Sequence, residues 1–345
     1  MNTTRIDLAN IALMLISCAA AFIIPFELFL FSYAVLGPLH YLTEITWLHK
    51  RDYFANGKFD YVWLILLCAV LFILNFVFTE HPTAANFMIY LAFVSALGFV
   101  MFKDWLWKIG FIGIGAFLGG LIASTQSFFF LFAVFLPTLI HVFVFTGLFI
   151  LLGALKNRSI TGVISLVVFI ACAVSFFIFY PQFTFYKISD YAQKTLVESG
   201  FAMVNQSFVH IFNLGTTTRE TVFASNIGFG IMRFIAFAYT YHYLNWFSKT
   251  SVIKWHQVPK KWLITTIALW VASVGLYAYN YKTGLIALYF LSMLHVFLEF
   301  PLNYRSVIGI GEEFGTLTGL RKQPVPVSAK TPVASGKKGK TTPVR

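Results

Sequence analysis

Charge is scarce in this chain. Asp, Glu, Lys and Arg make up 11% of its 345 residues, whereas soluble domains carry roughly a quarter. Hydrophobic residues make up 59%, and apolar runs of about 20 residues, long enough to span about 30 Å of hydrocarbon, recur from end to end. These features exclude a soluble globular domain. The strict alternation of apolar and polar residues that is typical of β-strands is also missing, which excludes an outer-membrane barrel.

Cysteine and the familiar nucleotide motifs are equally sparse. Cys18, Cys68 and Cys172 lie in apolar runs without metal-site spacing, which predicts small core residues. The sequence contains no Walker A pattern, dinucleotide fingerprint or nucleophile elbow, so ATP-driven transport would need another subunit. The surplus of basic residues does not indicate nucleic acid, because much of it lies in short loops and in the C-terminal tail.

The sequence predicts an all-α, polytopic integral membrane bundle over residues 1–305, with about ten transmembrane helices. The expected spans are 8–24, 26–48, 60–79, 84–102, 105–124, 127–155, 160–180, 221–247, 262–279 and 284–303. Lys and Arg concentrate in every second connection, so the positive-inside rule places both termini in the cytoplasm. The first span ends in a loose signal-peptidase pattern, but Asp7 beside Arg5 and the immediate second span favour an uncleaved helix.

Two segments fall outside this pattern of spans. Residues 181–220 form the longest non-cytoplasmic connection, and apolar positions recur every three or four residues in 188–212, which predicts an amphipathic connector helix. Residues 306–345 are basic and, from 330 onwards, rich in Lys, Pro, Ser, Thr and Gly. This composition predicts a largely disordered cytoplasmic tail, which either stays solvated or is attracted to anionic lipid.

Four histidines stand inside the apolar spans: His40, His141, His242 and His295. All four predicted spans run in the same direction, so their depths can be compared at 1.5 Å per residue. His40, His242 and His295 lie about 13, 10 and 15 Å from the inner boundary, and His141 about 22 Å. Ionisable groups are costly in a bilayer and usually face the bundle interior, so the four side chains are expected to converge if their helices are neighbours.

Two glutamates accompany these histidines. Glu44 follows His40 by four residues, and Glu299 follows His295 by four, so each pair shares one helix face. Imidazole and carboxylate together are a common ligand set for transition metals such as iron, and the glutamates are candidates either for direct chemistry or for orienting the imidazoles. A proton-handling site is the alternative interpretation.

Arg233 and a set of aromatic residues complete the polar features of the spans. A buried Arg requires a carboxylate or an anionic ligand, so Arg233 is a candidate for substrate contact or for a structural ion pair with Glu27, Glu44 or Glu299. The aromatic residues around His242 fit either an interfacial belt or the wall of an apolar ligand site.

Two short segments resemble a known family. GPLH at 37–40 is similar to the early Pro-His-Gly segment of the Brp/Blh-like carotenoid dioxygenases, and YHYLNW at 241–246 resembles their late aromatic-His segment. These bacterial membrane enzymes cleave β-carotene to retinal using iron held by histidines. The resemblance implies His40 and His242 as iron ligands, an apolar isoprenoid substrate and the bacterial inner membrane. In this chain Tyr41 replaces the glycine after the early histidine, and the family's closely spaced late histidine pair is missing.

Three functions remain open at this point. The first is a metal-dependent oxidoreductase, dioxygenase-like, that uses Fe2+ or another transition metal on an apolar isoprenoid or lipid. The second is a proton-coupled secondary transporter that uses the same His and Glu residues as a relay. The third is a membrane scaffold in which these residues only hold helices together. The oligomeric state is not predicted.

Overall fold

A computed structural model describes residues 3–180, 186–249 and 259–320. Helices make up nearly all of the described residues, and no strand occurs among them. The predicted all-α polytopic bundle is therefore confirmed. The predicted orientation of the termini is not tested by the fold and stays a prediction.

The helices follow the predicted spans closely. The chain forms α1 (Thr3–Ile23), α2 (Pro25–Phe31), the π-helix η1 (Ser32–Leu36), α3 (Gly37–His49), the 3₁₀ turn η2 (Asp52–Phe54), α4 (Asp60–Phe76), α5 (Pro82–Met101), α6 (Trp105–Ile122), α7 (Gln126–Phe128), the π-helix η3 (Phe129–Phe145), α8 (Thr146–Asn157), α9 (Ile160–Ile178), α10 (Asp190–Glu198), α11 (Ala202–Ile211), α12 (Arg219–Ala224), α13 (Asn226–Ser248), α15 (Lys260–Tyr279) and α16 (Tyr281–Leu317). Several of these join end to end, so that 25–49 and 126–157 are each one continuous helical span.

Within the described ranges, eight helical spans are long and apolar enough to cross a membrane. α4 is apolar but shorter, with 17 residues. α13, which carries Arg233, His242 and several tyrosines, is not among the eight although it has 23 residues. The eight spans show a multi-pass membrane protein, and α4 and α13 occupy the positions of the other two predicted spans.

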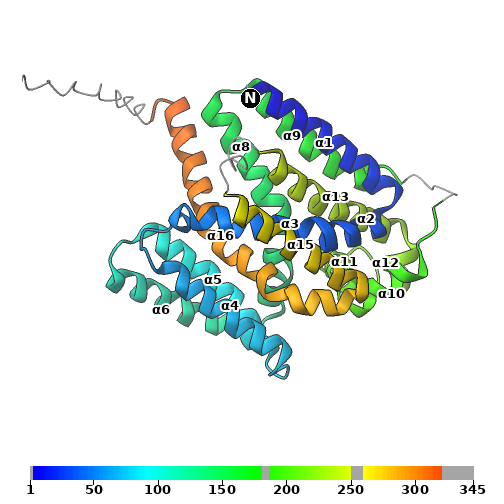
Figure 1. Cartoon of the computed structure of the whole chain (residues 1–345), viewed down its shortest axis with the longest axis horizontal. Helices are drawn as coiled ribbons and strands as arrows, with labels where there is room; N and C mark the ends of the chain where they lie inside the picture. The colour runs from blue at the N-terminus through cyan, green and yellow to red at the C-terminus, as the bar shows by residue number, and fades with distance from the viewer. Residues whose placement is uncertain (1–2, 181–185, 250–258, 321–345) are drawn as a thin grey trace, which may run out of the picture.

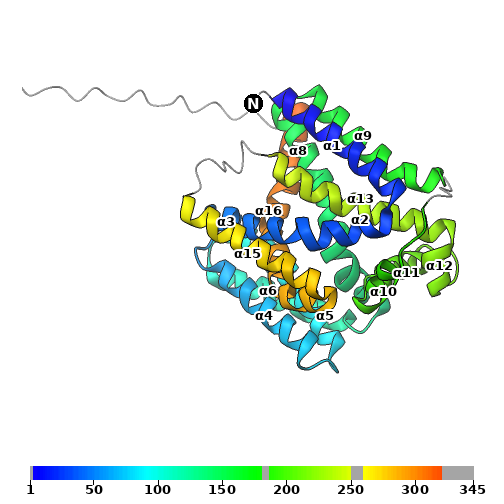
Figure 2. The same ribbon diagram turned by 45° about the vertical axis from the view of Figure 1, so that its right-hand side comes forward.

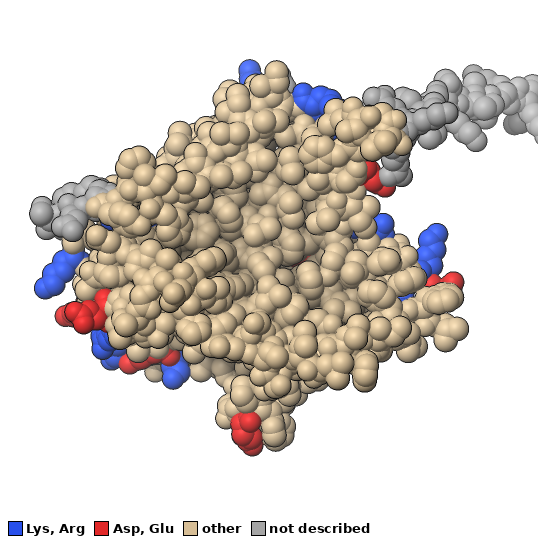
Figure 3. All heavy atoms as spheres, turned by 180° about the vertical axis from the view of Figure 1, so that it is seen from behind, with Lys and Arg blue, Asp and Glu red and all other residues tan. Residues whose placement is uncertain are grey.

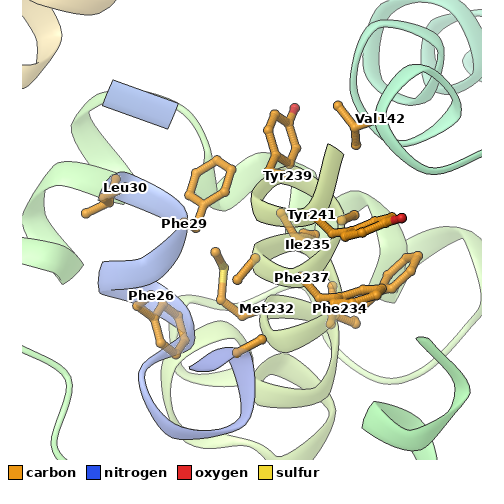
Figure 4. Close-up of a cluster of buried hydrophobic side chains, with 14 of the residues drawn as sticks. Phe26, Phe29, Leu30, Val142, Met232, Phe234, Ile235, Phe237, Tyr239 and Tyr241 are labelled. Carbon is orange, nitrogen blue, oxygen red and sulfur yellow. The ribbon is translucent and has the colours of Figure 1, made fainter. Parts of the chain in front are cut away.

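The helices form two packed groups. In one, α1 packs against α9 and α13, and α13 packs against α2 (Figures 1 and 2). Figure 4 shows this core, in which Phe29 of α2 and Tyr239 of α13 meet edge to face with ring centroids 5.1 Å apart. In the other group α4, α5 and α16 pack together, with α6 against α5. Helix α3 contacts both α13 and α16, so it lies where the two groups meet.

The outer surface is largely apolar. Figure 3 shows charged side chains at the margins of one face, with a broad uncharged area between them. Helices α6 and α15 are the most exposed: only 11% of the residues in the apolar stretch of each are buried. Large side chains such as Leu106, Phe117 and Ile264 stay more than half exposed on them. An apolar surface of this extent is what lipid contact requires.

Two segments differ from the sequence-based expectation. α16 continues to Leu317, past the predicted tail boundary at 305, because it packs against α8. A Cβ at Gly309 would lie 3.2 Å from Leu152 of α8. Arg158, which follows α8, pairs with Glu313 of α16 at 2.9 Å. The remaining tail, 321–345, lies outside the described residues. The connector forms two helices, α10 and α11, where one was expected, because Gly200 adopts φ +79° between them and ends the first.

Candidate metal centre

Four histidines from four different helical segments converge in the interior of the bundle. His40 lies on α3, His141 on η3, His242 on α13 and His295 on α16. None of the four side chains is more than 6% exposed. The potential ligand atoms of His40, His141 and His295 all lie within 4.8 Å of one another, and the ring of His242 lies 4.7 Å from that of His40 and 5.0 Å from that of His141.

The imidazoles face one another through the same ring nitrogen. The Nε2 atoms of His40 and His242 are 3.1 Å apart, and those of His141 and His295 are 3.2 Å apart. Nitrogens bound at 2.0–2.1 Å to a tetrahedral metal lie about 3.3 Å from each other. The spacing within each pair therefore suits imidazoles that share one cation, and the buried group of His40, His141 and His295 could bind a metal ion.

The position of His141 depends on an unusual helix. Residues 129–145 are π-helical and contain Pro137, which cannot donate a backbone hydrogen bond. Between His141 and Lys156 only residues 141–145 are π-helical, so the π-helix shortens that distance little. The residue count to Lys156 nevertheless placed His141 deeper than the other three histidines. The structure brings it level with the other three histidines.

The two glutamates also reach the cluster, but not as matched pairs. Glu44 Oε2 lies 2.9 Å from Nε2 of His40, its neighbour on the same helix. Glu299 was expected to pair with His295, its neighbour on α16. Its Oε2 instead approaches Nδ1 of His141, on η3, at 3.2 Å. A carboxylate on the far ring nitrogen of a ligating histidine is a common way to orient the imidazole.

The cluster holds several buried polar atoms without a hydrogen-bond partner. They are Nδ1 of His40, His141 and His295, and Oε2 of Glu44 and Glu299. The short carboxylate–imidazole contacts above lack hydrogen-bond alignment, so they leave these atoms unsatisfied. Buried unsatisfied groups each cost about 1–3 kcal/mol and call for an explanation. A cation bound by the Nε2 atoms would explain Oε2 of Glu44, which lies 2.9 Å from Nε2 of His40, but it would not satisfy the Nδ1 atoms on the opposite side of each ring.

Thr146 is a contact of the histidine cluster that the sequence analysis missed. Its Oγ1 lies 2.9 Å from Nδ1 of His242, and both side chains are buried. This contact fixes the ring of His242 and leaves Nε2 directed at the cluster. Nothing in the sequence distinguishes Thr146 from the other threonines of the spans, so only the packing of η3 against α13, which continues into Thr146 at the start of α8, reveals it.

Replacing Thr146 by Val should weaken metal binding about 10–100-fold, as loss of an outer-shell partner typically does. The change keeps the side-chain shape and removes only the hydroxyl, so packing around His242 is retained. The matched variant Thr146→Ser keeps the hydroxyl and should bind metal within about threefold of wild type. Competition with a metallochromic chelator measures both affinities. Equal affinity in the Val and Ser variants would show that Thr146 does not orient His242.

Aromatic residues enclose the cluster. The rings of Tyr243 and Trp246 lie 5.1 and 5.6 Å from His40, and Tyr41 lies 5.7 Å from His295. Trp246 donates its Nε1–H to Thr43 Oγ1 at 3.0 Å. Tyr239, Tyr243 and Trp246 are at most 9% exposed. These residues therefore form walls of the site and not an interfacial belt.

Arg233 lies elsewhere. It stands on α13 about 13 Å below His242, at 1.5 Å per residue. Its guanidinium carbon lies 5.4 and 5.8 Å from the ring centroids of Phe22 and Phe229. Glu27 accepts hydrogen bonds from the Tyr186 hydroxyl and from the backbone and side chain of Ser189. The candidate role of Arg233 in the chemistry of the histidine cluster therefore gains no geometric support.

Two cavities reach the cluster from different sides. The first, of about 360 Å³, is called here the tyrosine cavity; its lining includes Tyr33, Tyr239, Tyr243, Tyr289, His141 and His295. The second, of about 440 Å³, is called the lysine cavity; its lining includes His40, Glu44, His242, Glu299, Lys156 and Lys249. Burial lowers the pKa of Lys249, and the carboxylates of Glu299 and Glu44 oppose that shift. Each cavity thus ends at two of the four histidines.

The fold and the site define a multi-pass helical membrane protein with a buried histidine cluster. No protein-family model, curated protein or solved structure matches the chain. What the protein does must therefore be argued from the site itself.

Proposed function

We propose that this protein is a metal-dependent membrane oxidoreductase that acts on an apolar isoprenoid or lipid. The observation that carries the proposal is the convergence of four buried imidazoles, from four separate helices, through facing Nε2 atoms at 3.1 and 3.2 Å. Holding four such groups in an apolar bundle is costly unless they bind something. Short-segment resemblance to the Brp/Blh-like dioxygenases supports the same reaction class and the bacterial inner membrane.

The ligand set favours iron among the candidate metals. Neutral imidazole suits iron, zinc, copper and nickel, and carboxylates within reach shift the preference toward the harder iron. His40, His141, His242 and His295 would hold the metal, with Glu44 beside His40. When bound, iron would supply the one-electron chemistry that activates dioxygen.

The residues of the chain supply the remaining functions. Thr146 and Glu299 face the Nδ1 atoms of His242 and His141 and so orient both rings. The largely apolar linings of the two cavities accept a hydrophobic molecule beside the histidines. Glu44 and Glu299, buried at the cluster, are placed to hold or accept a proton during turnover.

The proposal predicts that the protein, purified in a mild detergent, carries about one equivalent of iron. The metal content is measured by plasma mass spectrometry, and oxygen consumption is followed with lipid and isoprenoid extracts before and after chelation. Less than about a tenth of an equivalent of any transition metal would overturn the proposal. Metal without oxygen uptake on any extract would leave a metalloprotein but reject the oxidoreductase.

One observation favours a second candidate, a proton-coupled transporter. The tyrosine and lysine cavities meet the same His/Glu cluster from two sides, as the two halves of an interrupted pathway would. In that case uptake into proteoliposomes should follow an imposed pH gradient and be lost in the double variant Glu44→Gln, Glu299→Gln. Uptake that ignores the gradient and survives both substitutions would reject this candidate.

A further inference from the structure

The lysine cavity carries charge in an ordered way. Its closed end is formed by Glu44 and Glu299, both 2% exposed, together with His40 and His242. Its open end has Lys156 and Asn157, which are exposed, and Lys249, which is half-buried. The Lys249 ammonium lies 5.6 Å from the ring centroid of Phe149 on the cavity wall. Lys156 therefore places positive charge at the mouth, whereas Lys249 lies within electrostatic reach of Glu44 and Glu299.

The walls between these two ends are apolar. They are formed by Trp47, Phe149, Leu152, Trp246 and Leu302. From His242 to Lys249 helix α13 rises about 10 Å, at 1.5 Å per residue. A slot of this depth takes up part of a hydrocarbon chain, and Asn157, Asn245 and Ser306 add hydrogen-bonding groups to its lining.

We infer that the lysine cavity binds a single-chain amphiphile with an anionic head, which lies between Lys156 and Lys249 while the apolar chain extends toward His40. The two lysines supply the point charges that a carboxylate or phosphate requires. The reverse orientation would place the anionic head beside Glu44 and Glu299, where like charges repel at low dielectric. That this amphiphile is the substrate rests on the proposed function. Its binding does not, because binding in the lysine cavity requires no metal.

The tyrosine cavity does not offer the same site. Its lining contains a single basic residue, Lys282, so it offers no pair of ammonium groups between which an anionic head could lie. Lysines at a membrane boundary also occur simply as interfacial anchors. What distinguishes Lys156 and Lys249 is that both line one cavity that ends at buried carboxylates. Lys282 therefore provides a matched control for the two.

The test uses the full chain in a neutral maltoside detergent, freed of metal by chelation. The fluorescent polyene cis-parinaric acid is titrated at mildly alkaline pH, where it is ionised, alongside its uncharged methyl ester. We expect the acid to bind about tenfold more tightly than the ester, the sum of two partly exposed charge contacts. The double variant Lys156→Met, Lys249→Met should lower affinity for the acid to that for the ester. Lys282→Met should change neither.

A second variant tests the location of the chain. Gly153 lines the lysine cavity, and a Cβ added there meets nothing within 4 Å. Gly153→Phe should therefore fill the slot and abolish binding of both probes; should this variant misfold, the lysine variants decide alone. Competition by lysophosphatidic acid or by oleate then shows whether phosphate or carboxylate is the preferred head.

Equal affinity for acid and ester in the wild type, or an acid preference that survives the double lysine variant, would overturn the inference. Failure of the proposed function is read separately, from metal content and oxygen uptake. A protein that binds the acid but no metal would keep this site and lose the oxidoreductase.

Discussion

Replacing His141 by alanine should reduce bound metal from about one equivalent to below about a tenth. His141 contacts two of the other three histidines: its Nε2 faces that of His295 at 3.2 Å, and its ring lies 5.0 Å from that of His242. Loss of a ligand should exceed the about 10–100-fold effect of losing an outer-shell partner. His295→Ala should behave in the same way, because both histidines belong to the group whose ligand atoms lie within 4.8 Å.

His210→Ala is the matched control. His210 is exposed on α11, where its Nε2 lies 3.0 Å from Gln126 Nε2. This variant should keep the metal content of the wild type. Size-exclusion profiles and circular dichroism establish that each variant is folded before its metal is counted. If His141→Ala and His210→Ala retained the same metal content, the cluster would not be the binding site. If, in addition, only His141→Ala were less stable than the wild type, the cluster would serve as a scaffold that holds the helices together.

The convergence of the histidines follows from physics that is visible in the sequence. Imidazole and carboxylate groups in apolar helices must face the interior, and counting residues to the basic boundaries placed His40, His242 and His295 at similar depths. The structure brings these three together, and brings Glu44 and Glu299 with them. Apolar length likewise predicted the helical bundle, because a bilayer permits few other solutions.

The remaining features depend on long-range packing that periodicity does not encode. The π-helix around Pro137 carries His141 near its end, and no sequence pattern marks it. Thr146 contacts His242, which lies 96 positions farther along the chain. Glu299 contacts His141 on another helix, although the sequence predicted a contact with His295. The two cavities are spaces between helices, so they become visible only once the helices are placed.

A buried ion pair between α4 and α6 is the clearest of these long-range features. Asp60, at the start of α4, and Lys108, in the first turn of α6, are 3% and 2% exposed. The ammonium of Lys108 donates to both carboxylate oxygens, at 2.8 and 2.7 Å, and the backbone N–H of Gly57 donates to Oδ2 at 2.9 Å. In the sequence Lys108 marks only a basic boundary, with nothing to indicate a partner 48 positions away.

Lys108→Met should therefore destabilise the protein by about 3–5 kcal/mol, because it leaves the Asp60 carboxylate buried without its counter-charge. The double variant Asp60→Leu, Lys108→Met should recover most of that loss, since replacing both partners by apolar groups of similar size removes the uncompensated charge. Reversible unfolding in mixed micelles with increasing SDS gives the free energies.

Arg158→Met is the control for losing a cation. Arg158 pairs with Glu313 at 2.9 Å, but its side chain is 44% exposed, so the change should cost no more than about 1 kcal/mol. A Lys108→Met variant as stable as Arg158→Met would mean that solvent or lipid headgroups reach Asp60. A double variant no more stable than Lys108→Met would instead mean that the packing of the lysine stem against Phe99 and Trp105, whose ring centroids lie 5.5 and 5.6 Å from its ammonium, holds α6 in place.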